Sequence, residues 1–250
     1  IAASAASALA QYPPTEMTAG AELRPPSLEH LFGTDEFGRD LWSRTLFGLR
    51  ASFAAGGLST LLGGTVGVVL GTLAGYRGGK TDAILMRAID GLLAIPAILL
   101  GIAIVAALGP GLRNVTVTLA IVQVPIYARL TRGCVLSETH QEYVTAAVAL
   151  GGTALHIVRH HILRNILSPI VVQTALAVGF SVLIEASLSF LGLGIRPPEP
   201  SLGSILDASR NVMRHAVWYP VFPGAVLVLL LYALNGTADV LNDVLEGRRR

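Results

Sequence analysis

The glycine-rich segment AGYRGGKT, residues 74–81, is the first place where residue types and spacing could do chemistry. It satisfies a relaxed P-loop pattern, in which backbone amides and a lysine, here Lys80, hold nucleotide phosphates. A P-loop follows a buried strand and opens a helix in a soluble α/β domain. Here the segment joins two apolar runs with no strand pattern nearby. We therefore predict a tight glycine-rich turn and no nucleotide binding.

The histidines are the second candidate for chemistry. His156 and His160 have the i, i+4 spacing of zinc-binding helices. However, His160 and His161 point about 100° apart on a helix, no acidic third ligand is close in sequence, and Arg159 would repel a cation. The single Cys134 excludes multi-cysteine metal sites and disulfide frameworks. No nucleophile motif is present either, so we predict no catalytic residue, no metal and no cofactor.

Two carboxylates that lie in or beside long apolar runs are the third candidate. Asp90 and Glu185 occupy such positions, where ionisable side chains are costly and usually functional. They could line a water-filled passage. The alternative is a partnered charge, for example with Arg87, with Arg132 or with a second subunit.

The composition indicates the elements that must position these residues. Hydrophobic residues make up 52% of the 250-residue chain and charged residues only 14%, against about 25% charged residues in a soluble domain. The mean hydropathy is +0.63. This excludes disorder, disfavours an ordinary soluble enzyme and predicts a membrane protein. The net charge of +2 is too small to indicate a nucleic-acid partner, while the pI of 8.9 suits loops that face anionic membrane lipid.

Five apolar runs are candidates for spanning helices, each approaching or exceeding the length of about 20 residues that a bilayer requires. The shortest can be extended by snorkelling arginines. The runs cover residues 51–76, 91–112, 114–128, 169–194 and 217–238. We therefore predict an all-α polytopic fold, with kinks at Pro96 and Pro125.

The chain begins with Ile1, and we interpret residues 1–10 as the end of a missing first helix; a signal-peptide remnant is the alternative. This interpretation gives two parts. Residues 1–45 form the end of that helix and an extracytoplasmic segment, and residues 46–245 form the transmembrane domain.

Small residues recur within the first run, where they would let helix backbones approach closely. We predict that they form one packing face: Gly56, Gly57, Gly63, Gly64, Gly67, Gly71 and Gly75.

A polar loop at 138–168 interrupts the apolar runs and carries apolar residues at helical spacing on both sides of Gly151 and Gly152. Two glycines destabilise a helix, and Thr153 is a good N-cap for a second helix after them. The loop is therefore predicted to form two short amphipathic helices hinged at Gly151. Such a pair suits a lipid surface or a partner protein.

The stretch YVTAAVALGGTALHIVRHHILRN in this loop resembles the cytoplasmic EAA loop of binding-protein-dependent ABC importer permeases, where an Ala-Ala pair precedes a key glycine. Ala146, Ala147 and Gly151 match that pattern. The sequence departs from it at Thr145, where the family usually has Glu, and at Arg164, where it often has Pro.

Other segments are similar to the dipeptide/oligopeptide/nickel subfamily, and to its C-type permease in particular. They are GTDEFGRDLWSRTLFGLRASF, GYRGGKTDAILMRAIDGLLAIP, SLSFLGLGIRPPEPSLGSIL and WYPVFPG. The resemblance implies a type I ABC importer transmembrane domain of the MetI-like kind in the bacterial inner membrane. The partners it implies are a homologous B-type permease, two ABC ATPase subunits that hydrolyse the ATP, and an extracytoplasmic binding protein.

The resemblance also assigns the coupling loop, 138–168, to ATPase docking, with these residues as candidates: Thr145, Ala146, Ala147, Gly151, Gly152, Leu155 and Arg159. For a peptide substrate, Asp90 or Glu185 could receive the ammonium group. The alternatives are a stand-alone secondary transporter or channel, and a permease for nickel or another small solute. Lys/Arg bias near span ends predicts one cytoplasmic side, which holds Lys80, the 138–168 loop and the last three arginines, 248–250.

Overall fold

A computed structural model of the chain describes residues 6–247. The predicted end of a missing helix at 1–10 therefore lies partly outside the described residues, and the arginines at 248–250 lie wholly outside them. Within the described residues the regular secondary structure is helical. Extended backbone pairs there in an isolated β-bridge between Thr34 and Asp40.

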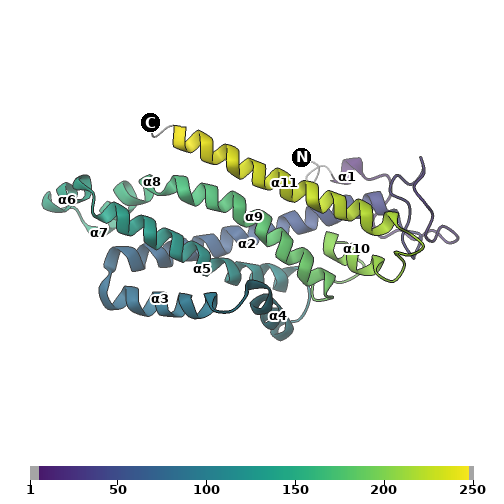
Figure 1. Cartoon of the computed structure of the whole chain (residues 1–250), viewed down its shortest axis with the longest axis horizontal. Helices are drawn as coiled ribbons and strands as arrows, with labels where there is room; N and C mark the ends of the chain where they lie inside the picture. The colour runs from purple at the N-terminus through teal and green to yellow at the C-terminus, as the bar shows by residue number, and fades with distance from the viewer. Residues whose placement is uncertain (1–5, 248–250) are drawn as a thin grey trace.

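The long helices run roughly side by side in an elongated bundle (Figure 1). The short helices α6 and α7 lie at one end of the bundle, and α1 and α10 lie towards the other. The elements are α1 (Ala6–Leu9), α2 (Leu41–Arg77), α3 (Gly79–Leu93), α4 (Ala97–Leu108), α5 (Leu112–Thr139), α6 (Glu142–Ala149), α7 (Ala154–Ile157), the π-helical turn η1 (Val158–Ile162), α8 (Leu163–Asn165), α9 (Leu167–Phe190), α10 (Leu202–Ser209) and α11 (Trp218–Gly247).

Four helices are long and apolar enough to cross a membrane, namely α2, α5, α9 and α11. The predicted run at 91–112 is not one straight span: α3 and α4 are bent by 90° at the break between them, and only together do they pass the same test. Pro96 lies at this break. Proline interrupts a helix because it lacks a backbone N–H and disfavours the helical conformation of the residue before it. Pro125, in contrast, lies inside a continuous α5. Helix α2 begins at Leu41, a few residues before the predicted boundary at 45.

The predicted glycine face is where α2 packs on its neighbours. A Cβ atom built on Gly63 would lie 2.3 Å from the carbonyl oxygen of Ala120, and one on Gly71 would lie 2.4 Å from that of Ala128. Both partners belong to α5. Gly56 faces α9 instead, and Gly57 has no atom within 4 Å of its Cβ position. The prediction is confirmed for this face, apart from Gly57.

A buried ionic cluster fixes the leading segment, residues 10–40, to the bundle. Asp35 is fully buried; its carboxylate accepts a hydrogen bond from Arg39 Nε at 2.6 Å, and Arg44 Nε lies 3.3 Å away. Tyr219 on α11 donates a hydrogen bond of 2.6 Å to Glu36. Because these side chains come from the segment, α2 and α11, they join three parts of the chain at the α10 end.

The start of α2 is capped by a second carboxylate next to this cluster. Asp40 accepts a hydrogen bond from the Ser43 backbone N–H at 2.8 Å, which satisfies one of the free amides of the first turn. Its other oxygen lies 3.0 Å from His30 Nδ1. The segment TDEFGRD therefore sets where α2 begins.

Candidate functional site

The 138–168 loop folds as a small helical unit on the end of α5. Its core is an apolar cluster contributed by α5, the loop helices and the residue before α9: Val135, Val144, Ile157, Ile162 and Ile166. The loop contains two helical segments, α6 and the run α7–η1–α8. This agrees with the predicted pair, although the second segment is longer than α7 alone. The loop is therefore an ordered unit attached to the end of the bundle.

Gly151 ends α6 in a Schellman motif. Its N–H donates to the carbonyl of Val148 at 2.9 Å, and the N–H of Gly152 donates to that of Ala147 at 3.0 Å. Gly151 has φ +82°, a conformation that L side chains rarely adopt. Thr153 then caps α7, accepting a hydrogen bond from the His156 N–H. The glycine pair thus sets the angle between the two helical segments.

The predicted docking residues lie mostly on the outer surface of this unit. The exposed ones are Thr145, Ala146, Gly151, Leu155 and Arg159, while Ala147 and Gly152 are half-buried. Leu155 is 76% exposed and Leu150, which the sequence reasoning did not single out, is 88% exposed. Leu150 and Leu155 thus place apolar side chains on the exposed surface of this loop.

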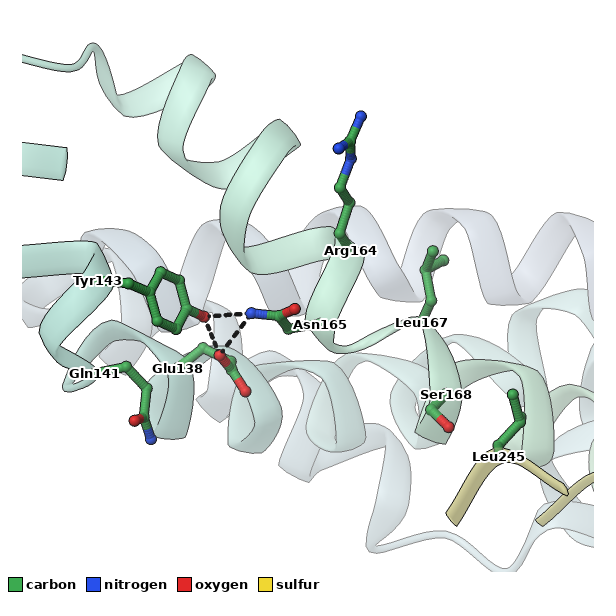
Figure 2. A pocket seen from close by; sticks show the side chains of 8 residues that line it. All are labelled: Glu138, Gln141, Tyr143, Arg164, Asn165, Leu167, Ser168 and Leu245. Carbon is green, nitrogen blue, oxygen red and sulfur yellow. Dashed lines mark hydrogen bonds between the residues drawn. The ribbon is translucent and has the colours of Figure 1, made fainter. Parts of the chain in front are cut away.

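The neck of the loop, where residues 138–143 meet residue 165, is held by a polar triad that the sequence analysis missed. The hydroxyl of Tyr143 donates to the carboxylate of Glu138, and the Asn165 side-chain amide lies 2.7 Å from the Tyr143 hydroxyl oxygen. Figure 2 shows the three groups pointing at one another, with Arg164 directed away. They line an open cavity of about 620 Å³ that also reaches Leu245 of α11.

This triad joins the end of α5, the start of α6 and the end of α8, so both ends of the loop are tied together. The Tyr143 hydroxyl is protonated at neutral pH, as tyrosine normally is, and burial and the hydrogen bond to the Glu138 carboxylate raise its pKa further. No short sequence motif predicts these contacts, because they join residues that are 5 to 27 positions apart in the chain.

Replacing Tyr143 by Phe is expected to loosen the neck. It removes both hydrogen bonds of the hydroxyl, and a typical hydrogen bond contributes about 0.5–1.5 kcal/mol. We expect amide hydrogen exchange in α6 to become about fivefold faster. Tyr232→Phe is the matched control, because Tyr232 is 79% exposed on α11. Equal exchange rates in the two variants would show that the triad does not stabilise the loop.

The other candidates for chemistry lie apart from one another. The predicted glycine-rich turn between α2 and α3 is confirmed, with φ +62° at Gly78 and +54° at Gly79. Lys80 is exposed in the first turn of α3 that follows. The rings of His156 and His160 stack with centroids 4.5 Å apart. Within residues 6–247, no three His, Cys, Asp or Glu side chains are placed to hold a metal ion.

Asp90 forms an ion pair with Arg129 of α5, not with Arg87 or with Arg132. Arg132 pairs instead with Asp82, at 2.6 Å between its Nη2 and the carboxylate. The Asp90 and Arg129 side chains are 58% and 60% exposed. Their α-carbons lie about 16 Å along α3 and about 15 Å from the end of α5, at 1.5 Å per residue. An ion pair that faces lipid hydrocarbon is costly, and water or a protein neighbour relieves that cost.

Glu185 lies elsewhere, enclosed between α2, α9 and α10. Its side chain has no exposed surface, and one carboxylate oxygen accepts a hydrogen bond of 2.7 Å from Ser189. For this carboxylate to line a passage, as the sequence suggested, a neighbouring element would have to move away.

Long helices able to span a membrane, one broken helix pair and an ordered helical loop define a polytopic α-helical membrane protein. Solved structures share the fold. A chain of the MetNI methionine ABC transporter in an inward-facing conformation matches with a TM-score of 0.67 and 22% identity, over 79% of this chain and 94% of that one. A chain of an amino acid ABC transporter crystallised with histidines matches with a TM-score of 0.61 and 12% identity, over 80% and 93%.

The chain belongs to the family of binding-protein-dependent transport system inner membrane components, which it matches over residues 67–250. The predicted family, the MetI-like ABC importer fold and the location in the bacterial inner membrane are thereby confirmed. The family is that of the membrane-embedded permease, which is not itself an ATPase.

Curated relatives cover nearly the whole chain. The probable D,D-dipeptide transport system permease protein DdpC of Escherichia coli (strain K12) is 42% identical over 95% of this chain and 80% of its own length. The dipeptide transport system permease protein DppC of Alkalihalophilus pseudofirmus is 43% identical over 91% and 75%. The glutathione transport system permease protein GsiD of Pectobacterium atrosepticum is 43% identical over 88% and 73%.

Proposed function

We propose that the chain is one of two permease subunits of an ATP-driven peptide importer. It would form half of the translocation pathway, together with a homologous B-type permease. Two ABC ATPase subunits and an extracytoplasmic peptide-binding protein would complete the complex. The names of relatives about 40% identical, which transport dipeptides, D,D-dipeptides or glutathione, support a short peptide substrate over nickel.

The 138–168 loop is the observation that carries the proposal. It has its own apolar core and presents exposed apolar side chains at one end of a membrane bundle, which suits a groove on a partner. We assign it as the coupling loop that docks on one ATPase. The docking face comprises Thr145, Ala146, Ala147, Gly151, Gly152, Leu155 and Arg159. This end of the bundle would then be cytoplasmic, and the end with α10 extracytoplasmic.

The passage would follow the face that α3 and α5 share. Asp90 and Arg129 are more than half exposed there, and a water-filled path between two permeases would solvate them. The pair offers one negative and one positive group to a substrate that carries both an ammonium and a carboxylate. The predicted role of Asp90 is thus kept, with Arg129 as its companion.

Leu155→Asp is expected to separate this chain from the ATPase. A hot-spot side chain contributes about 2 kcal/mol or more to an interface, and a charge placed in an apolar pocket must be desolvated on docking. We expect the amount of ATPase that copurifies with the two permeases to fall at least tenfold, with peptide uptake lost.

The control is Leu28→Asp, because Leu28 is 96% exposed in the leading segment, far from the loop. Unchanged copurification of the ATPase with Leu155→Asp would refute the docking face. Peptide uptake by the two permeases in the absence of any ATPase would instead identify a stand-alone transporter.

A further inference from the structure

The carboxyl group of Glu185 is the most enclosed ionisable group in the spanning helices, and the transport scheme above does not use it. One oxygen is bonded to Ser189, whereas Oε2 is buried without a hydrogen-bond partner. The side chains of Ser52 on α2 and Ser201 at the start of α10 lie next to the same carboxyl, and the hydroxyl oxygen of Ser52 is likewise buried without a hydrogen-bond partner. Within the described residues, no arginine, lysine or histidine forms an ion pair with it.

The short helix α10 is wedged against α2 and α9 at this point. A Cβ atom on Gly203 would lie 2.2 Å from the carbonyl oxygen of Ala186 on α9, and one on Gly48 would lie 3.0 Å from the backbone of Ser201. Leu202 and Ile205 have no exposed surface. Helix α10 is therefore held in a narrow groove, and its first turn lies directly over Glu185.

We propose that Glu185 is a positioning residue that holds α10 against α2 and α9, through its hydrogen bond to Ser189 and its polar contacts with the hydroxyls of Ser52 and Ser201. Serines approach the carboxyl from all three helices or their caps, and Ser201 is also the N-cap that organises α10, accepting from the Ser204 N–H at 3.1 Å. The carboxyl thus links the cap of α10 to the membrane helices. Loss of this link frees α10 to leave its groove.

Hydrogen bonding explains the site better than a charge does. An ionised carboxylate without a cation is costly inside a membrane bundle, and the surrounding groups are hydroxyls, which can donate or accept. Glutamine has the same shape and also donates and accepts, so it can keep the link. Alanine removes the carboxyl, and with it the hydrogen bond to Ser189 and the polar contacts with Ser52 and Ser201.

The test measures how accessible α10 is in the complex of both permeases, both ATPases and the binding protein, held in lipid nanodiscs. A cysteine replaces Leu202 in a Cys134→Ser background, and a charged maleimide labels it. We expect Glu185→Gln to label as slowly as the parent and Glu185→Ala to label at least tenfold faster. Ser189→Ala should be intermediate. Ser187→Ala is the control, because Ser187 bonds to the Leu183 carbonyl at 2.8 Å and not to Glu185.

A second reporter separates loosening of α10 from general unfolding. A cysteine replacing Leu119 of α5, which is 1% exposed, should stay unlabelled in every variant. If it reacts in Glu185→Ala, that variant has unfolded. The labelling rate at position 202 in Ser189→Ala, compared with that in Ser187→Ala, then decides whether the carboxyl holds α10. Slow labelling at position 202 in both Glu185→Ala and Ser189→Ala would overturn the proposal.

Peptide uptake adds a readout that rests on the proposed function, whereas the labelling does not. We expect uptake to be retained in Glu185→Gln and reduced in Glu185→Ala. Loss of uptake in Glu185→Gln with slow labelling at position 202 would show that the charge itself is needed. That result would overturn the positioning role and favour a carboxylate in the passage.

Discussion

Gly151→Val is expected to uncouple peptide uptake from ATP hydrolysis. Gly151 has φ +82° and its Cβ position is open, with no atom within 4 Å, so the penalty is backbone strain and not a clash. A strained residue of this kind costs about 1–3 kcal/mol. The chain relieves the strain by changing the turn, which alters the angle between α6 and α7. In the reconstituted importer, peptide taken up per ATP hydrolysed should fall by about fivefold or more.

Gly151→Asn is the matched variant for this experiment. Asparagine tolerates positive φ far better than a β-branched residue does, so it should keep most of the coupling, with Gly151→Ala in between. All three variants should still assemble with the partner permease, because the loop lies outside the spanning helices. Normal coupling in Gly151→Val would rule out a role for this turn in transmitting ATP hydrolysis.

Much of the loop could be predicted because its signals are local. A glycine pair between two apolar periodicities predicts a chain reversal, and Thr153 predicts the next helix start; both are present. The triad of Glu138, Tyr143 and Asn165 could not be predicted in this way, since its members meet only after the loop has closed on its own core.

The predicted kink at Pro96 is present, but the size of the bend within 91–112 was not predictable. Hydropathy measures how apolar a run is but not its direction, and the bend of 90° between α3 and α4 changes only the direction. Pro96 carried the signal, but a proline also lies inside the unbroken α5. The partner of Asp90 was missed for a geometric reason. Arg87 is closer in sequence, but the antiparallel packing of α3 on α5 brings Arg129 to Asp90 instead.

The glycine face was predictable because α2 repeats its small residues every four positions, from Gly63 to Gly75, which keeps them on one side of the helix. What the sequence could not supply was the partner helix. The structure identifies α5, and it also separates Gly57, which has open space, from the glycines that touch a backbone. That difference within one helix makes a controlled experiment possible.

Gly67→Val is expected to destabilise the bundle severely. A Cβ atom there would lie 2.5 Å from the Cβ of Tyr127 and 2.7 Å from the carbonyl oxygen of Val124. Neither atom is the end of a flexible side chain, so α2 and α5 must separate. Overpacking typically costs about 1–3 kcal/mol, occasionally more, and we expect at least the upper end of that range. The thermal unfolding midpoint of the purified complex should fall by several degrees, with a lower yield of assembled protein.

Gly57→Val separates the effect of packing from the effect of helix propensity. Both substitutions place a β-branched residue in the interior of the same helix, so the change in helix propensity is the same. Only Gly67 has backbone and Cβ atoms within 3 Å of the new side chain. The difference between the two midpoints therefore measures the close approach of α2 to α5. Equal midpoints would mean that the glycine face does not hold these helices together, and that the contact between them relaxes without cost.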